Sequence, residues 1–471
     1  MHQIELLLLV LLLWTAVAKA DPVCKVCMCS ETTVNCVARN LQLHFNDSDW
    51  PSDMVITDVM IDNNQLVHVT QYPPLAVLRL SLSHNNIVGI DSAAFMHLQN
   101  LTELDLSHNF ITSENLASDV FKGVFAPDRY QPLANLETLR LGSNAIHTLK
   151  SDLFEHIVNL RILTLDANPL RVLDQGTVLA LSSLPYLEVL DLSYTDLKDL
   201  PEYLLHTPKN LKVLNLTGNF MTRVPSALEH SHALEVLHFS ENPVVVLDRS
   251  SFKSDMPYLR ELHMSYMENL TYIASGAMSK LTALQELYLS HNPRLSSIHP
   301  DTFSSRRDGE KSEEWPPIVK LDLGHNNLAS LDRHLLGHWK ILQYLNLVGN
   351  RWLCDCENQW MVSTLLPAVE NITKYQIDTL ECVEPEQMRG RKLHELEVRN
   401  YHMRCLDSAG NHPEKDAKML VGILVGVLLA VPVTMIALLL FRKSNFGSRF
   451  FSRGPASYSR AFYSPADSGE N

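Results

Sequence analysis

The chain has 471 residues, of which 46% are hydrophobic and 20% are charged, so its composition provides ample core material and excludes a globally disordered protein. Its formal net charge is −14 at pH 7. This acidity argues against nucleic acid and anionic lipid surfaces as partners and mildly favours basic ligands, although an acidic surface also simply keeps a protein soluble.

Residues 1–20 read as a secretory signal peptide. An apolar run from Leu6 to Leu13 is followed by Ala18-Lys19-Ala20, which resembles the small-residue site of signal cleavage. Glu5 stands where a positive charge is usual, and the alternative is an uncleaved anchor, for which the run is short. We therefore expect the chain to be exported.

The eight cysteines form two clusters, one in a predicted N-terminal cap (residues 21–52) and one near the other end of the chain. The clusters contain Cys24, Cys27, Cys29 and Cys36, and then Cys354, Cys356, Cys382 and Cys405. In an exported chain such clusters predict disulfides, and four cysteines allow three pairings. Zinc binding is the alternative to disulfides for the first cluster, but an oxidising compartment disfavours it. No cysteine is left over to support a disulfide-linked dimer.

Between the clusters, residues 53–350 repeat one pattern twelve times. The clearest copy, from Leu101 to Ile111, reads L-x-x-L-x-L-x-x-N-x-L, which is a leucine-rich repeat. The Asn position falls at Asn64, Asn85, Asn109, Asn144, Asn168, Thr195, Asn219, Asn242, Met267, Asn292, Asn326 and Asn350. Each copy predicts a short strand with its leucines turned inward, and stacked copies share one core. We predict an α/β solenoid, a right-handed leucine-rich repeat horseshoe with a parallel concave β-sheet.

Two features interrupt the regularity of the repeats. Met267 has no hydrogen-bond donor to replace the Asn side chain, so we expect a local irregularity there without a break. Two intervals are also longer than the others, with the excess in Ser113–Pro132 and Ser304–Pro317. Inserted loops on repeat scaffolds often carry binding contacts. The first could instead be packed core around Phe121, Phe125 and Tyr130, and the second a solvated loop.

The residues between the two strand leucines should face outward on the concave sheet. The most distinctive group among and beside them consists of His238, Glu261, His263, Glu286 and Tyr288, which are our candidate ligand contacts. Neighbouring histidines could sense pH or bind a metal, but a polar patch for protein contacts is the favoured interpretation. No nucleophile–base pair, metal motif or phosphate loop stands out, so we expect no enzyme and no cofactor. A hydrolase facing the outside of the cell is the alternative from another class.

Five N-x-S/T sequons fit an exported glycoprotein. They begin at Asn46, Asn100, Asn215, Asn269 and Asn371. Asn215 lies between Leu214 and Leu216, so its side chain should point out of the concave sheet. A glycan there would block the middle of that face, so either the site is unoccupied or partners dock to one side of it.

Residues 419–441 form an uncharged apolar run that would span about 34 Å as a helix, enough to cross a bilayer. A short stalk (residues 406–418) precedes it, and Arg442 and Lys443 begin a basic tail (residues 442–471) that is too short for a kinase domain. The positive-inside rule predicts a single-pass type I plasma membrane protein. The Gly422-x-x-x-Gly426 pattern is compatible with a homodimer, although glycine frequency in membrane helices explains most such patterns.

The second cysteine cluster opens with Asn350-Arg-Trp352-Leu-Cys354-Asp-Cys356, close to an N-P-W-x-C-D-C signature in which Arg351 replaces Pro. With the repeats, it resembles animal extracellular leucine-rich repeat receptors that have cysteine-rich caps and one membrane span. The resemblance covers roughly Cys24 to Cys405 and implies a C-terminal cap over residues 351–405. It also implies the disulfides Cys24–Cys29, Cys27–Cys36, Cys354–Cys382 and Cys356–Cys405.

The same resemblance implies function only coarsely, because Toll-type immune receptors, adhesion molecules and neural guidance receptors share this architecture. We expect a cell-surface recognition receptor that binds an extracellular protein ligand or co-receptor, in adhesion or ligand binding, with any signal relayed by a partner. The alternative is an innate-immune receptor or co-receptor that recognises microbial products.

Overall fold

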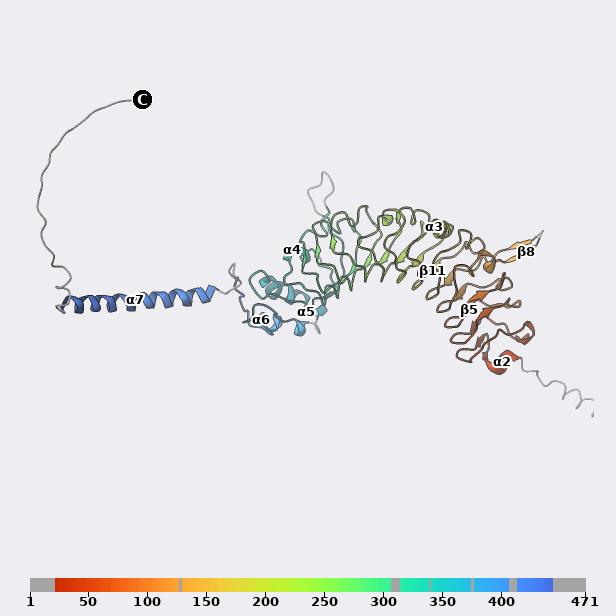
Figure 1. The fold of residues 1–471 in the computed structure, drawn as a ribbon, viewed down its shortest axis with the longest axis horizontal. Coiled ribbons are helices and arrows are strands. Elements are labelled where there is room, and N and C mark those ends of the chain that lie inside the picture. Colours follow the sequence, from red (N-terminus) through yellow and green to blue (C-terminus); the bar gives the residue numbers. More distant parts are fainter. Residues whose placement is uncertain are drawn as a thin grey trace, which may run out of the picture. The chain divides into compact units, whose positions relative to one another are not determined.

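A computed structural model describes residues 22–126, 129–305, 314–338, 340–373, 377–405 and 413–443. The chain divides into two compact units, Met1–Met403 and Arg404–Asn471, which are described separately (Figure 1). The predicted signal peptide, most of the stalk and the tail beyond Lys443 lie outside the described residues.

The first unit is built on a 14-stranded sheet whose strands follow one another in chain order. Its first two strands, β1 (Met28–Ser30) and β2 (Thr33–Asn35), are antiparallel. The other twelve run parallel and belong to the twelve predicted repeats: β3 (Asp58–Met60), β5 (Arg79–Ser81), β7 (Glu103–Asp105), β10 (Thr138–Arg140), β11 (Ile162–Thr164), β12 (Val189–Asp191), β13 (Val213–Asn215), β14 (Val236–His238), β16 (Glu261–His263), β18 (Glu286–Tyr288), β20 (Lys320–Asp322) and β21 (Tyr344–Asn346). The predicted twelve-turn solenoid is confirmed.

Each parallel strand has three residues, of which the middle one is buried. The register aligns these middle residues, so that Leu139, Leu163 and Leu190 occupy equivalent positions on neighbouring strands. All three are at most 1% exposed. Since a strand turns alternate side chains to opposite faces, the flanking residues of each strand lie on the outer face of the sheet. Within the first unit, the arrows line the inner side of the curved stack (Figure 1).

The second half of each repeat closes the opposite side of the core. It contains short strands and helical turns: β4 (His68–Val69), β6 (Gly89–Ile90), η2 (Ser118–Phe121), α3 (Gln175–Ser182), η3 (Ser226–His230), β15 (Val246–Leu247), β17 (Tyr272–Ile273), β19 (Ser297–Ile298) and α4 (Arg333–Leu336). The rings of Tyr72, Phe95 and Phe121 stack in succession, with centroids 6.2 and 6.4 Å apart. These rings extend the leucine core through three neighbouring repeats.

The first insertion combines the two alternatives that the sequence left open. Phe121 is fully buried and belongs to the core. The residues after it form an antiparallel hairpin of β8 (Val124–Ala126) and β9 (Arg129–Gln131), on which Tyr130 is 51% exposed. Of the second insertion, residues 306–313 lie outside the described part, and Ser305 pairs with Glu314 across its base.

The Asn side chains form a ladder through the interior of the stack. Asn242 is representative: its Oδ1 accepts the Met221 N–H at 3.0 Å, and its Nδ2 donates to the carbonyls of Leu216 and Phe239 at 2.9 and 3.1 Å. Each Asn therefore satisfies buried backbone groups of its own repeat and of the repeat before it. At Thr195 the hydroxyl takes part instead, donating to the Leu192 carbonyl at 2.6 Å.

The repeat of Met267 has the expected local irregularity, and the strand register continues past it through β14, β16 and β18. In ten repeats the next buried apolar residue comes two residues after the Asn position, but here it is Leu270, three residues on. The extra residue is accommodated by a turn in which the Leu270 N–H donates to the Met267 carbonyl at 3.1 Å. The repeat of Asn292 has the same spacing, with Leu295 donating to the Asn292 carbonyl at 3.0 Å.

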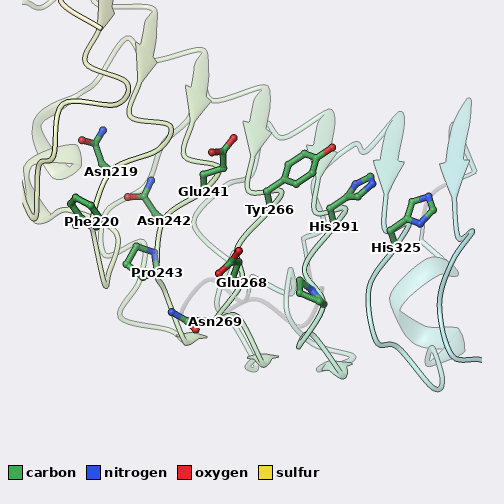
Figure 2. A pocket seen from close by; sticks show the side chains of 11 residues that line it. Asn219, Phe220, Glu241, Asn242, Pro243, Tyr266, Glu268, Asn269, His291 and His325 are labelled. Carbon is green, nitrogen blue, oxygen red and sulfur yellow. The ribbon is translucent and has the colours of Figure 1, made fainter. Parts of the chain in front are cut away.

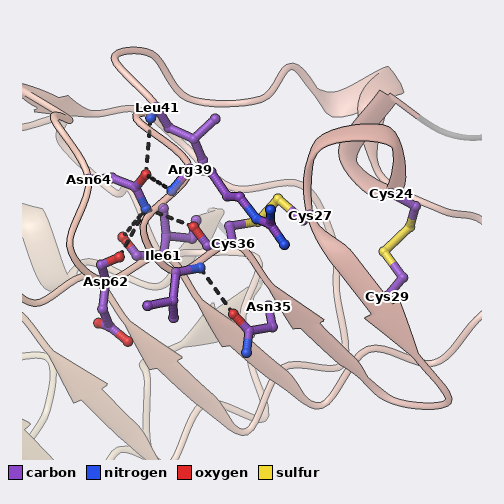
Figure 3. The surroundings of a disulfide bond; sticks show 11 residues. Cys24, Cys27, Cys29, Asn35, Cys36, Arg39, Leu41, Ile61, Asp62 and Asn64 are labelled. Carbon is purple, nitrogen blue, oxygen red and sulfur yellow. Dashed lines mark hydrogen bonds between the residues drawn. A yellow bond between two sulfur atoms is a disulfide. The ribbon is translucent and has the colours of Figure 1, made fainter.

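Disulfide-bonded caps close both ends of the stack, as predicted. The N-terminal cap holds α2 (Pro22–Val26), β1, β2 and η1 (Asp47–Asp49), with disulfides Cys24–Cys29 and Cys27–Cys36. Asn64 of the first repeat joins the cap by donating to the Cys36 carbonyl and accepting from the Arg39 and Leu41 amides (Figure 3). The C-terminal cap contains a π-helical turn η4 (Met361–Leu365), α5 (Leu366–Thr373), η5 (Ile377–Thr379) and α6 (Leu393–Val398).

The C-terminal cap contains the disulfide Cys354–Cys382. Cys356 and Cys405 are also disulfide-bonded. All eight cysteines of the chain lie in the described residues and none is free. Because the caps replace neighbouring repeats that the end repeats lack, they cover core that would otherwise meet water.

The half-buried His44 lies where the N-terminal cap meets the repeats. The His44 ring meets the Tyr72 ring edge-on at 5.0 Å, and burial lowers the pKa of His44 to about 4, with the nearby His68 adding to the effect and Asp91 opposing it. The unfolded chain binds a proton at this residue below about pH 6.5, whereas the folded cap resists protonation until about pH 4. Stability contributed by neutral His44 is therefore lost as the pH falls through this window.

We expect acidification from pH 7 to pH 4 to weaken the cap by about 3 kcal/mol through this residue alone. Amide hydrogen exchange of residues 33–60 at the two pH values measures the loss. In a His44→Leu variant the acid-dependent part of the exchange should largely disappear. A His232→Gln variant, altered at an exposed histidine, is the control and should respond to pH as the unaltered chain does. Equal pH responses of His44→Leu and the unaltered chain would refute the assignment.

The described part of the second unit contains the helix α7 (Pro413–Lys443). Its residues Lys418–Lys443 have a mean hydropathy of 2.9 in their most apolar stretch and are long enough to cross a membrane. Pro432 lies inside the helix, and Arg442 and Lys443 form its last turn.

Candidate recognition site on the concave face

The five candidate contacts predicted from the sequence lie on three neighbouring strands of the concave sheet. Strand register places His238, His263 and Tyr288 side by side at the ends of β14, β16 and β18. Glu261 and Glu286 begin β16 and β18 and are likewise in register. The structure therefore brings all five residues into one patch, which we call the concave patch.

The three rings of the concave patch stack in a row across the strands. The centroids of His238 and His263 are 4.4 Å apart with the planes tilted by 33°, and those of His263 and Tyr288 are 4.4 Å apart with the planes only 11° from parallel. All three side chains are half-buried. Stacking at strand spacing holds the rings in fixed orientations while one side of the row stays accessible.

Carboxylates fix the edges of these rings. Glu261 lies with Oε1 2.6 Å from His263 Nε2, and the Tyr288 hydroxyl donates to Glu286 Oε2 at 2.8 Å. Lys320, on the next strand β20, places its Nζ 2.9 Å from the other oxygen of Glu286. Sequence reasoning missed Lys320, although it occupies the strand position of Glu286 one repeat later.

The charges of the concave patch follow from this packing. Burial, reinforced by the neighbouring His263, lowers the pKa of His238. Burial, together with the hydrogen bond to Glu286, raises the pKa of Tyr288. Burial opposes ionisation of Glu286, but the hydrogen bonds from Lys320 and Tyr288 outweigh it and lower the pKa of Glu286. At neutral pH the patch thus presents a neutral His238 and Tyr288 beside ionised Glu286.

Asn215 lies on the strand next to the concave patch, where its residue position is paired with His238. Its side chain is half-buried, and its Nδ2 donates to Asp191 Oδ2 at 2.9 Å. A glycan on Asn215 would stand directly beside the ring row, so its presence would confine a partner to the strands from β14 onward. Occupancy of this sequon remains a prediction.

A second row of rings runs along the turns that follow the strands, and sequence reasoning did not find it. The residue before each ladder position has a positive φ in all twelve repeats, including His84, His108, His291 and His325. These four histidines stand in repeated Ser-His-Asn or Gly-His-Asn triplets, a pattern that by itself indicates structural turn residues. Their rings also stack: Tyr266, His291 and His325 form a row with centroids 4.5 Å apart, which Figure 2 shows in part.

Metal binding finds no support in the described residues, where no group of three or more His, Cys, Asp or Glu side chains could hold an ion. His263 stacks face to face with Tyr288 and meets the tilted ring of His238 on its other side. Their geometry is therefore that of a packed contact surface.

Family models described as leucine rich repeat match residues 56–111, 76–124, 185–244, 232–293 and 283–305. The chain is a leucine-rich repeat protein. Mouse podocan is 28% identical over 323 residues, which cover 66% of this chain and 48% of podocan. Chicken tsukushi is 26% identical, covering 58% of this chain and 61% of tsukushi, and mouse CD180 antigen is 25% identical, covering 67% and 42%.

The leucine-rich repeat chain thus spans between about two-fifths and three-fifths of the length of these relatives. They are extracellular leucine-rich repeat proteins. This similarity supports a general function in ligand recognition through protein binding.

Proposed function

We propose that the protein is a cell-surface recognition receptor that binds an extracellular protein ligand or co-receptor through the concave patch. The stacked row of His238, His263 and Tyr288 carries this proposal. Rigid rings with polar edges are well suited to anchor a protein interface, because little conformational entropy is lost when a partner covers them.

The charges around the ring row indicate the chemistry of the partner. Glu261 and Glu286 lie within the concave patch. Asp322 occupies an outward position on the adjacent strand β20, and Asp191 occupies one on β12, two strands away from β14. Lys320 pairs with Glu286 and also interacts electrostatically with Glu261, so it is a single positive charge set against these four carboxylates. A partner segment with lysine or arginine side chains beside an apolar residue would complement both the rings and the excess of carboxylates.

Membrane attachment supports a receptor function. Helix α7 has the length and hydropathy of a membrane span, and Arg442 and Lys443 at its end favour a cytoplasmic position for the tail. Together with the predicted signal peptide and the disulfide caps, this supports a type I plasma membrane protein whose repeats lie outside the cell. Adhesion or ligand binding is the proposed role, with any signal relayed by a membrane partner.

The test uses cells that display the full chain, probed without permeabilisation by an array of purified extracellular domains. We expect at least one domain to bind, and Tyr288→Ala to weaken its binding by roughly tenfold or more, as truncation of a central interface aromatic does. His263→Ala should act in the same direction because it removes the ring on which Tyr288 stacks.

Matched controls separate this site from general damage. Tyr186→Ala and His232→Ala make the same changes at exposed residues away from the concave patch and should leave binding unaltered. Normal affinity in both patch variants would contradict the assigned surface. Binding of microbial material in place of every host domain would contradict the proposed ligand class and favour an immune receptor.

A further inference from the structure

A groove of about 700 Å³ opens on the turns along the second ring row, and Tyr266, His291 and His325 of that row line it. Its walls include the rings of Phe220, Tyr266 and Pro243, and carboxylates of Glu241 and Glu268 lie among them (Figure 2). Tyr266 and Phe220 are 53% and 54% exposed, which is unusual for large apolar side chains that share one hollow.

The irregular spacing after Met267 and Asn292 shapes this groove. Because the buried leucine comes one residue late in both repeats, the two residues at the centre of each turn are displaced toward solvent. These are Glu268 and Asn269 in one turn and Pro293 and Arg294 in the next, and the first three of them line the groove. The groove also extends over neighbouring turns of regular length, which contribute Phe220, Pro243 and His325 to its lining.

Asn269 is also the first residue of the sequon Asn269-Leu270-Thr271. Its side chain is half-exposed, and its Oδ1 lies 3.4 Å from Arg294 Nη1. Its Nδ2, the atom to which an N-linked glycan is attached, donates no hydrogen bond to any described residue. By contrast, Nδ2 of Asn46 donates to Asp49 and Nδ2 of Asn215 donates to Asp191.

We propose that Asn269 carries an N-linked glycan whose first sugar residues pack into this groove. A sugar attached to a residue of the groove wall is held at the groove by its covalent bond. Its effective concentration there is high, so packing costs little translational and rotational entropy. The apolar faces of sugar rings match the rings of Tyr266 and Phe220, and their hydroxyls can donate to Glu241 and Glu268. The groove therefore has the two kinds of surface that a carbohydrate needs.

The glycan changes the chemical character of the surface at these turns. It covers Tyr266 and Phe220, which would otherwise be an apolar patch open to association, and it fixes a sugar beside the turn row. None of the five residues of the concave patch lines the groove. The inference is thus independent of the proposed function, and the receptor can use its concave patch while the edge is occupied by its own glycan.

The experiment uses the full chain expressed in a secretory eukaryotic cell. Peptide mapping by mass spectrometry measures the occupancy of Asn269, and hydroxyl-radical footprinting measures the solvent access of Tyr266 and Phe220. We expect a glycan on Asn269 and a severalfold rise in labelling of both rings in Asn269→Gln. Asn100→Gln removes a sequon at an exposed position elsewhere and should leave that labelling unchanged.

Enzymatic release of glycans from the folded protein gives a second measurement that needs no variant. A glycan packed in the groove should be released severalfold more slowly from Asn269 than from Asn100. An unmodified Asn269 would overturn the proposal, and so would equal labelling of Tyr266 and Phe220 with and without the glycan. Equal release rates at the two sites would likewise show a glycan that does not pack.

Discussion

Replacing Leu163 by alanine is expected to lower the free energy of unfolding of the repeat stack by roughly 2–5 kcal/mol. Leu163 is fully buried at the centre of β11, in register with Leu139 on one side and Leu190 on the other. Truncation removes apolar contacts to both neighbouring repeats at once. Because strands on either side hold the backbone in place, the cavity can collapse only partly.

Urea unfolding followed by circular dichroism measures this loss, and hydrogen exchange of β10, β11 and β12 locates it. A repeat stack is stabilised mainly between neighbours, so the increase in exchange should be largest at these three strands. Leu179→Ala makes the same change on α3, where the side chain is half exposed, and should cost far less. If the two variants unfolded alike, the shared leucine core would not be the source of stability.

The fold could be predicted from the sequence because every repeat has nearly the same spacing of buried leucines and the ladder residue. Leucine alternation fixes which strand face is buried. The side-chain amide of the Asn, three residues after the second strand leucine, can reach several backbone groups at once. Even Thr195 fits, since its hydroxyl donates to the Leu192 carbonyl. The sequence predicted an irregularity at Met267 from its missing amide, but the shifted turn follows from the late leucine at Leu270, because the repeat of Asn292 has the same turn with its amide present.

The candidate site was predictable in part for the same reason. Alternation identified His238, His263 and Tyr288 as outward residues, but their stacking required the register of β14, β16 and β18. The second ring row was missed because Tyr266 and its neighbours follow the strand, where the sequence pattern indicates a turn and does not say which way a side chain points. One sequence feature could have indicated this row. An aromatic or histidine residue directly precedes the ladder position in three successive repeats, ending at His325.

In the first insertion, the sequence did not indicate which aromatic residues are buried and which are exposed. Phe121 and Tyr130 are both aromatic residues of one inserted segment, and composition gave no means of separating them. Phe121 stacks on Phe95 inside the core, whereas Tyr130 lies on the hairpin with its hydroxyl 3.0 Å from His156. Only the position of each ring relative to the preceding repeat distinguishes a core residue from a surface residue.

The asparagine ladder leads to the second prediction, in which Asn85→Ala lowers the free energy of unfolding by about 3 kcal/mol. Asn85 is buried and its Oδ1 accepts the Leu66 N–H at 3.1 Å. Its Nδ2 donates to the carbonyls of Ile61 and Leu82 at 2.9 and 3.0 Å. Those two carbonyls also accept from the neighbouring ladder residues Asn64 and Asn109, so they keep a partner in the variant.

The Leu66 N–H has no such second partner among the described residues, so the main cost of Asn85→Ala is one buried donor without an acceptor. Hydrogen exchange should report this directly, because the Leu66 amide loses its protection while amides of distant repeats do not. Asn86→Ala is the matched control, since the adjacent Asn86 is exposed and its side chain makes no hydrogen bond within the described residues. Comparable destabilisation by the two variants would mean that asparagine at the ladder position acts through turn propensity and not through the hydrogen bonds that join one repeat to the next.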